Sequence, residues 1–174
     1  IDDADKAYEL VMNGKQSLGI LLNYPGLETI NSQRTIKLPS TKKHQTKISK
    51  KTRYKANVSF LGAGSYANSI LMPAFKSNDI NFSIVASSKG VSGFHAARKY
   101  GFRSTTTDSE ILFVDNDTDT LVITTQHDSH AHFVMKGLEC RKHIFVEKPL
   151  CLTLDELESI QSKYQKNFDF TSNL

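Results

Sequence analysis

Three short polar segments carry the residue types best suited to chemistry, at residues 62–67, 124–132 and 147–150. Each follows a short apolar run with the composition of a buried β-strand. Open α/β sheets bind ligands beyond the carboxyl ends of their strands, where side chains from several loops meet. We therefore expect these segments to form one ligand site, and the chemistry of each can be argued from its residues.

The first segment, Gly62-Ala-Gly64-Ser-Tyr-Ala67, has the spacing of a phosphate-binding turn. Gly62 permits a tight reversal after the strand, and Gly64 lets the backbone approach a pyrophosphate without an intervening Cβ atom. Ala67 is small enough for close packing of a helix on the strand. The first N–H groups of that helix then face the anion. The alternative is an ordinary glycine turn between two core elements.

The segment after the second expected strand reads Ser87-Ser88-Lys89, where an acidic residue would bind the ribose 2′-hydroxyl of NAD. Hydroxyls and an ammonium group tolerate a 2′-phosphate, because the repulsion from an acid is missing. These residues favour NADP over NAD as cofactor. The alternative is that they are ordinary loop residues.

The second segment contains His127, His130 and His132 beside Asp128, which raises the question of a metal site. No cluster of Cys, His or Glu elsewhere completes a coordination shell, so we expect none. An N-cap role for Asp128 or Ser129 is the simpler interpretation, with at least one histidine lining a cofactor groove.

The third segment places Lys148 before Pro149, which restricts the lysine backbone to an extended conformation. Its ammonium group can thus be aimed at a fixed point. Near a nicotinamide it could hydrogen-bond a reacting hydroxyl and stabilise the alkoxide that develops as hydride leaves. The alternative is a solvated surface charge.

The elements that must position these residues alternate between strand and helix patterns, which predicts an α/β fold with a doubly wound parallel sheet. A capping box of Thr153 and Glu156 predicts the start of the last helix, with a buried face of Leu157, Ile160 and Tyr164. The predicted strands of this part of the chain are 58–61, 82–86, 120–124 and 143–146. The other predicted helices are 66–75, 92–100, 107–113 and 129–138.

The N-terminal part differs in composition from the rest. A helix over 3–14 and a strand over 18–24 predict a short appendage at 1–28, followed by a linker at 29–55 and the main domain at 56–174. Nine basic residues and no acidic one lie between Arg34 and Lys55. Such a cluster could contact nucleic acid, but Tyr54 is its only aromatic residue, so we expect no such partner.

The sequence also indicates in which compartment of the cell the protein works. No apolar run approaches the roughly 18 residues that span a bilayer, and the first residues do not form a signal peptide. Cys140 and Cys151 are too few for a disulfide framework. These features predict a cytoplasmic protein without a membrane partner. The first residue is isoleucine, which suggests a fragment or a processed chain.

The ordered segments resemble the N-terminal domain of the glucose-fructose oxidoreductase / inositol dehydrogenase (Gfo/Idh/MocA) family over residues 56–166. The resemblance implies a Rossmann domain and NAD(P)-dependent oxidation or reduction of a sugar or polyol hydroxyl. The peptide before Pro149 is expected to be cis. By this resemblance the pyrophosphate contacts are Gly62, Gly64, Ser65, Tyr66 and Ala67, the adenosine contacts Ser87, Ser88 and Lys89, the groove residues Thr124, Thr125 and His130, and the nicotinamide and substrate contacts Glu147 and Lys148, with Lys148 catalytic.

The chain departs from the family pattern at two points. Gln126 stands where many members have proline, and the expected second domain, which supplies substrate contacts and a proton-transfer pair, does not follow. We therefore expect cofactor binding with little or no turnover, and a sugar-like substrate only together with that domain. The oligomeric state stays open, a homo-oligomer included. The alternative function is a non-catalytic Rossmann module for protein interaction or cofactor sensing.

Residues 1–25 resemble a different family. Their helix, Gly14-Lys15 and the following strand pattern are similar to the C-terminal end of zinc-type medium-chain alcohol dehydrogenases. None of that family's zinc ligands falls in this piece. Two-part oxidoreductases in which the two families are fused would combine both resemblances.

Overall fold

The computed structural model describes residues 4–13, 20–21, 34–39 and 55–171, with only the backbone described at 168–171. These residues belong to two units, Ile1–Gln33 and Arg34–Leu174. In the first unit, the predicted helix is present as α1 (Ala4–Met12). The predicted strand at 18–24 falls outside the described residues except Ile20 and Leu21, which are in no strand.

The second unit is built on a six-stranded sheet with the order β1-β4-β3-β2-β5-β6. The strands β2 to β6 are parallel to their neighbours in this set. From the central β2 the chain moves outward through β3 and β4, and then crosses to the other side of β2 for β5 and β6. This is the doubly wound Rossmann topology, and its switch point lies between β2 and β5. The strands are β1 (Thr35–Lys37), β2 (Asn57–Leu61), β3 (Asn81–Ala86), β4 (Ser104–Thr106), β5 (Thr120–Ile123) and β6 (His143–Val146).

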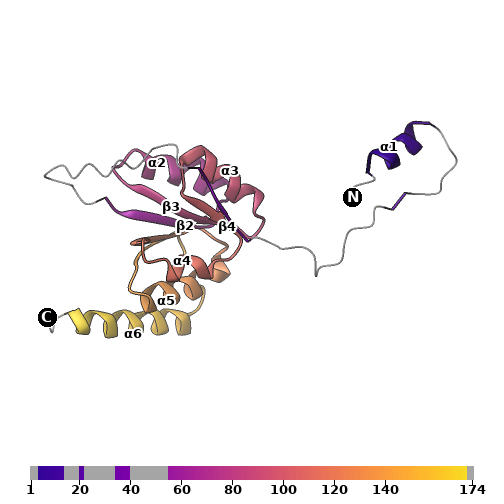
Figure 1. The fold of residues 1–174 in the computed structure, drawn as a ribbon. Coiled ribbons are helices and arrows are strands. Elements are labelled where there is room, and N and C mark those ends of the chain that lie inside the picture. Colours follow the sequence, from indigo (N-terminus) through magenta and orange to yellow (C-terminus); the bar gives the residue numbers. More distant parts are fainter. Residues whose placement is uncertain (1–3, 14–19, 22–33, 40–54, 172–174) are drawn as a thin grey trace, which may run out of the picture. The chain divides into compact units, whose positions relative to one another are not determined.

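Helices cover both faces of this sheet, as Figure 1 shows, with α2 and α3 on one face and α4, α5 and α6 on the other. The apolar core is accordingly split into two clusters. Val122 of β5 belongs to the first cluster, while Leu121 and Ile123 belong to the second. A strand buried on both faces favours apolar residues at every position, which explains the uninterrupted Leu-Val-Ile run of β5. The helices are α2 (Met72–Lys76), α3 (Val91–Tyr100), α4 (Glu110–Val114), α5 (His130–Glu139) and α6 (Leu154–Thr171).

Two short strands were missed by the sequence analysis. Residues 35–37, assigned to the linker, form β1, which pairs antiparallel with β4 and makes the sheet mixed rather than wholly parallel. The second missed strand is β4, which lies directly before the predicted helix at 107–113. That helix is shorter than predicted and begins at Glu110, as α4. Three residues are too few to show a period of two, and the Ser-Thr-Thr of β4 is polar although fully buried.

The helix after the glycine turn is irregular. Helical conformation begins at Ser65, passes through a π-helical turn (Ala67–Leu71) and continues as α2. Pro73 lies in the first turn of α2. Because proline has no N–H group, the ladder of hydrogen bonds is interrupted there, and a local π turn accommodates the break.

The capping box of α6 is confirmed. The Thr153 N–H donates to Glu156 Oε2 at 3.1 Å, and the Glu156 N–H donates to Thr153 Oγ1 at 3.2 Å. The predicted buried face is only partly right, because Ile160 is buried while Leu157 and Tyr164 are exposed. The helix contacts α5 also through polar groups, with Asn167 Nδ2 donating to the Leu138 carbonyl at 2.6 Å.

Candidate functional site

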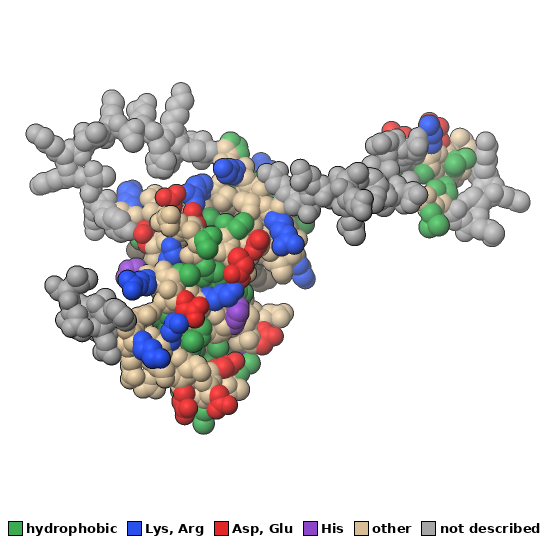
Figure 2. All heavy atoms as spheres, turned by 60° about the horizontal axis from the view of Figure 1, so that its bottom comes forward, with side chains coloured by type: hydrophobic (Ala, Val, Ile, Leu, Met, Phe, Trp, Pro, Cys, Tyr) green, Lys and Arg blue, Asp and Glu red, His purple; other side chains and the backbone are tan. Residues whose placement is uncertain are grey.

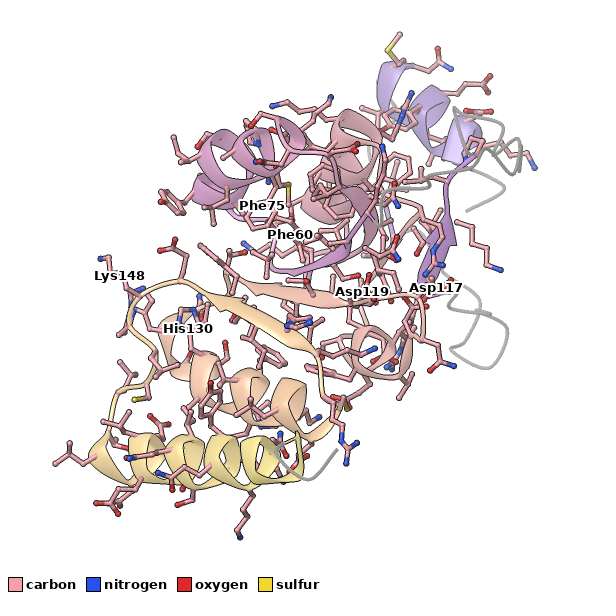
Figure 3. All side chains as sticks on the ribbon, turned by 90° about the vertical axis from the view of Figure 1, so that its left-hand side faces the viewer. Phe60, Phe75, Asp117, Asp119, His130 and Lys148 are labelled. Atoms are coloured by element: carbon pink, nitrogen blue, oxygen red, sulfur yellow. The ribbon has the colours of Figure 1, made fainter. Side chains whose placement is uncertain are left out.

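The three predicted segments lie at the same edge of the sheet. Figure 3 shows Lys148 and His130 at one end of the strands and Asp117 and Asp119 at the opposite end. Direct backbone hydrogen bonds join the strand ends: the Gly62 N–H donates to Ala86, the Thr124 N–H to Leu61, and the Glu147 N–H to Ile123, at 2.8 to 3.0 Å. The carboxyl ends of β3, β2, β5 and β6 therefore form one continuous edge.

Gly62 is required by its surroundings. Its φ of +105° is one that residues with side chains rarely adopt, and an added Cβ would lie 2.6 Å from the Thr124 carbonyl oxygen. The Thr124 hydroxyl lies 3.1 and 3.2 Å from the carbonyl oxygens of Leu61 and Gly62, to which it donates. Thr124, predicted as a groove residue, thus also holds the glycine turn against β5.

Gly64 has the opposite environment. An added Cβ would meet no atom within 4 Å, so the backbone faces open space at the start of the helix. Ser65 and Tyr66 are also exposed, whereas Ala67 is buried against the strand as expected. Asn68, which the sequence analysis did not select, donates through Nδ2 to the carbonyl oxygens of Ala63 at 2.7 Å and Gly64 at 3.1 Å. The turn therefore combines satisfied carbonyl groups with an open amide face, which fits a pyrophosphate.

The segment 87–89 forms a tight turn after β3. The Gly90 N–H donates to the Ser87 carbonyl at 3.0 Å, and the hydroxyl oxygens of Ser87 and Ser92 are 2.6 Å apart. Ser88 and Lys89 are exposed. The turn presents hydroxyls and one ammonium group at the place where an acid would otherwise select NAD.

The histidines of the second segment have separate environments. His127 is exposed in the 3₁₀ turn η3 (His127–Ser129), and its ring centroid lies 5.7 Å from that of His130. His130 is fully buried. Its Nδ1 lies 2.7 Å from the Pro149 carbonyl oxygen, and its Nε2 lies 3.1 Å from the Thr125 carbonyl oxygen. Contact of His130 with a cofactor stays a prediction; both ring nitrogens already face backbone carbonyls of the protein.

The N-cap interpretation of this segment needs a correction. Ser129 occupies the N-cap position of α5, but its side chain makes no capping hydrogen bond. Its hydroxyl oxygen lies 2.7 Å from both Thr125 Oγ1 and the Gln126 carbonyl oxygen. Ser129 therefore closes the loop after β5 instead of capping the helix.

The third segment follows β6 directly. The Lys148–Pro149 peptide bond is cis, as the family resemblance implied. Lys148 is exposed, and no acidic group among the described residues pairs with it. Glu147 is partly buried. The segment leaves one uncompensated ammonium group beside the switch point.

A doubly wound sheet whose strands β2 to β6 are parallel, with an open glycine turn at its switch point, has the architecture of the dinucleotide-binding α/β domains. Residues 56–170 match the family described as "Oxidoreductase family, NAD-binding Rossmann fold" (GFO_IDH_MocA), and the chain belongs to this family. The match begins at residue 56, so it does not test the resemblance of residues 1–25 to alcohol dehydrogenases. That resemblance stays a prediction.

Curated relatives agree with this assignment. The chain is 35% identical over 65 residues to the levoglucosan dehydrogenase of Pseudarthrobacter phenanthrenivorans, and the match covers 37% of this chain and 17% of the relative. It is 33% identical over 70 residues to the scyllo-inositol 2-dehydrogenase (NAD(+)) of Bacillus subtilis, covering 40% of this chain and 20% of the relative. The matched part is thus a fifth or less of each relative.

Solved structures show the same fold. A levoglucosan dehydrogenase in complex with NADH and levoglucosan superposes with a TM-score of 0.59 and 25% identity, over 66% of this chain and 33% of the other. KijD10, a 3-ketoreductase from Actinomadura kijaniata solved with NADP and TDP-benzene, gives a TM-score of 0.61 at 18% identity, over 66% and 35%. The superposed region is about a third of each of these chains.

Proposed function

We propose that the Rossmann domain binds NAD(P) across the carboxyl ends of β2, β3 and β5. The pyrophosphate lies over residues 62–67, the adenosine ribose against 87–89, and the nicotinamide toward 124–125 and 147–148. The observation that carries the proposal is the open backbone at Gly64, at the start of a helix and beside the switch point. His127, exposed on η3, borders the same groove.

The reaction we propose is hydride transfer to or from a sugar or polyol hydroxyl. The bound dinucleotide supplies the hydride acceptor or donor. Lys148, exposed and without a carboxylate partner among the described residues, hydrogen-bonds the reacting oxygen and stabilises its developing negative charge. Glu147, one residue earlier, fixes the orientation of the nicotinamide end. This domain corresponds to about a third of each related structure, so we propose that it supplies the cofactor-binding part of the site and that substrate contacts come from outside the matched residues.

For the cofactor itself, we infer a preference for NADP over NAD from Ser87, Ser88 and Lys89. No carboxylate stands in that turn to repel a 2′-phosphate. We propose a cytoplasmic location. None of the helices in the described part of the chain is long and apolar enough to cross a membrane. The proposed domain plan keeps an appendage at 1–28 and the Rossmann domain at 56–174, but β1, within the segment 29–55 assigned to a linker, is part of the Rossmann sheet.

A nucleic-acid role is less well supported. Among the described members of the basic cluster, Arg34 pairs with Asp108 and Lys55 with Asp79. On the face seen in Figure 2, acidic and basic side chains of the described residues are interspersed with hydrophobic ones. A duplex would instead favour a continuous basic surface.

Titration with NADPH and NADH, followed by nicotinamide fluorescence, tests the cofactor proposal. The informative variant is Gly64→Ala, because its added methyl group meets no protein atom and should leave the unfolding midpoint unchanged. We expect it to weaken dinucleotide binding by tenfold or more, since the methyl group occupies space needed by the pyrophosphate. Lys148→Ala should keep the wild-type affinity within about threefold. Absence of saturable binding to the wild-type chain at millimolar concentration would remove the proposal.

An activity measurement distinguishes the proposed function from the rival one, a non-catalytic Rossmann module. In a longer chain that includes the substrate domain, Lys148→Ala should abolish hydride transfer while dinucleotide affinity persists. Undiminished turnover in that variant would favour the interaction or sensing role.

A further inference from the structure

His130 joins two of the three segments at the proposed site. Its ring lies between the Thr125 carbonyl, at the end of β5, and the Pro149 carbonyl, after β6, at 3.1 and 2.7 Å. The side chain is fully buried, and it extends from the first residue of α5. One imidazole therefore connects a helix start with two neighbouring loops.

Both of these partners are carbonyl oxygens, which only accept hydrogen bonds. A ring with one N–H group donates to one carbonyl, and a ring with two N–H groups donates to both. In either case α5 supplies a donor to a carbonyl of at least one of the two loops. Buried carbonyl groups left without a donor are destabilising, so removing the ring favours separation of the two segments.

The position of Lys148 depends on this arrangement. Its backbone is held on one side by the hydrogen bond from the Glu147 N–H to the Ile123 carbonyl, at 3.0 Å. On the other side, the nearest tie to the rest of the domain is the contact of the Pro149 carbonyl with His130. The exposed Lys148 side chain itself has no partner among the described residues that would hold it.

We propose that His130 is a positioning residue that ties the Pro149 turn to the loop after β5 and so orients Lys148 toward the nicotinamide end of the bound cofactor. This role rests on the proposed function. It differs from direct contact with the cofactor, because the ring is buried beneath the loops.

The test compares His130→Phe, which keeps a ring but removes both nitrogens, with His130→Gln, which restores a single amide donor. His132→Phe and His132→Gln are the matched controls, since His132 lies on the same helix and is exposed. Two ligands are used, NADPH and ADP-ribose, which lacks both the nicotinamide and the 2′-phosphate; each variant is compared with wild type for the same ligand, so the phosphate difference cancels. We expect His130→Phe to bind NADPH about tenfold more weakly, more than the loss from Lys148→Ala, because both nicotinamide-side loops (124–125 and 147–149) lose the contact that joins them. ADP-ribose should bind within twofold of wild type, with His130→Gln between for NADPH.

Hydrogen exchange of the free protein gives a second reading that needs no ligand. The amides of Glu147 and Leu152, which donate to Ile123 and Glu156, should exchange about tenfold faster in His130→Phe, while β2 amides keep their protection and the His132 variants match wild type. Unchanged exchange at the turn, or equal loss in β2 and the turn, would overturn the positioning role. Equal losses of NADPH and ADP-ribose affinity would also overturn it. If the wild-type chain binds neither ligand, the proposed function fails while the exchange experiment still decides the role of His130.

Discussion

Individual residues at the carboxyl edge of the sheet divide into those that build the site and those left available for a ligand. Gly62, Thr124 and His130 are committed to holding loops together through backbone contacts. Gly64 and Lys148 face open space or solvent. This division predicts that substitutions in the first group act by loosening the loops, and that substitutions in the second group act directly on binding or chemistry.

Lys89 is the residue on which the proposed NADP preference depends most directly. Removing its charge in Lys89→Ala should weaken NADPH binding by about three- to tenfold, because an exposed ion pair with the 2′-phosphate is worth about 1 kcal/mol. NADH affinity should change by less than twofold, since NADH has no 2′-phosphate. Fluorescence titrations at two salt concentrations measure both values, and equal losses for the two cofactors would contradict the assignment.

Asp115 contributes stability that depends on pH. Burial alone would raise its pKa, but hydrogen bonds from Thr118 and Arg103 and the charge of Arg103 bring the pKa of Asp115 below its usual value. A carboxyl group whose pKa is lower in the folded state stabilises the fold at pH values above its unfolded pKa, which is about 4. This stabilisation is lost as the pH falls through the folded-state pKa. Asp115→Asn should therefore cost about 1–3 kcal/mol at pH 7 and progressively less below about pH 4.

Urea unfolding between pH 7 and pH 3 measures this difference. Asp117→Asn is the control, because the side chain of Asp117 is 70% exposed and its pair with Arg103 lies at the surface. It should cost under about 0.5 kcal/mol at pH 7. A gap between wild type and Asp115→Asn that stays constant to pH 3 would contradict the ionic contribution.

At the scale of elements, the ends of the helices determine how each strand enters the sheet. The helix α3 ends at Gly101, with φ +83°, where glycine is the preferred residue. The helix α5 ends differently, because Arg141 adopts φ +53° at the corresponding turn into β6. The Lys142 N–H donates back to Gly137 at 3.0 Å and so fixes this conformation.

The left-handed conformation of Arg141 predicts a stabilising substitution. Arg141→Gly should raise the free energy of unfolding by about 0.5–1 kcal/mol, because glycine avoids the steric cost that other residues pay at this φ. Arg141→Ala pays the same cost and should give no gain, which separates the backbone effect from loss of the side chain. Thermal and urea unfolding of the two variants provide the measurement. An equal gain in both would exclude the backbone explanation.

For the whole molecule, β1 determines where the folded Rossmann unit begins. The Leu38 N–H donates to Arg103 and the Thr107 N–H donates to Arg34, both at 3.0 Å, on either side of the β1–β4 ladder. Thr35 Oγ1 donates to the buried Thr106 Oγ1 at 3.0 Å. Residues 34–38 thus belong to the sheet, although their composition resembles that of the basic segment that follows.

Two N-terminal truncations test this boundary. A chain that begins at Arg34 should unfold at the same urea midpoint as the full chain, since residues 1–33 form a separate unit. A chain that begins at Ser40 lacks β1 and should lose about 1–3 kcal/mol, because β4 becomes an unpaired edge and Thr106 loses its contact with Thr35. Equal stability of the two truncated chains would show that β1 contributes nothing to the fold.

The sequence by itself determined the Rossmann class and the three segments of the site. Long apolar runs and glycine spacing report local conformation directly, so β2, β3, β5 and β6 and the capping box of α6 could be predicted. Tertiary structure decided what local pattern does not contain. The strands β1 and β4 are defined by their pairing in the sheet. His130 is buried where it contacts two carbonyls that lie 24 residues apart in the sequence, at Thr125 and Pro149. Contacts of that kind depend on how loops from different strands meet, and no periodicity along the chain reports them.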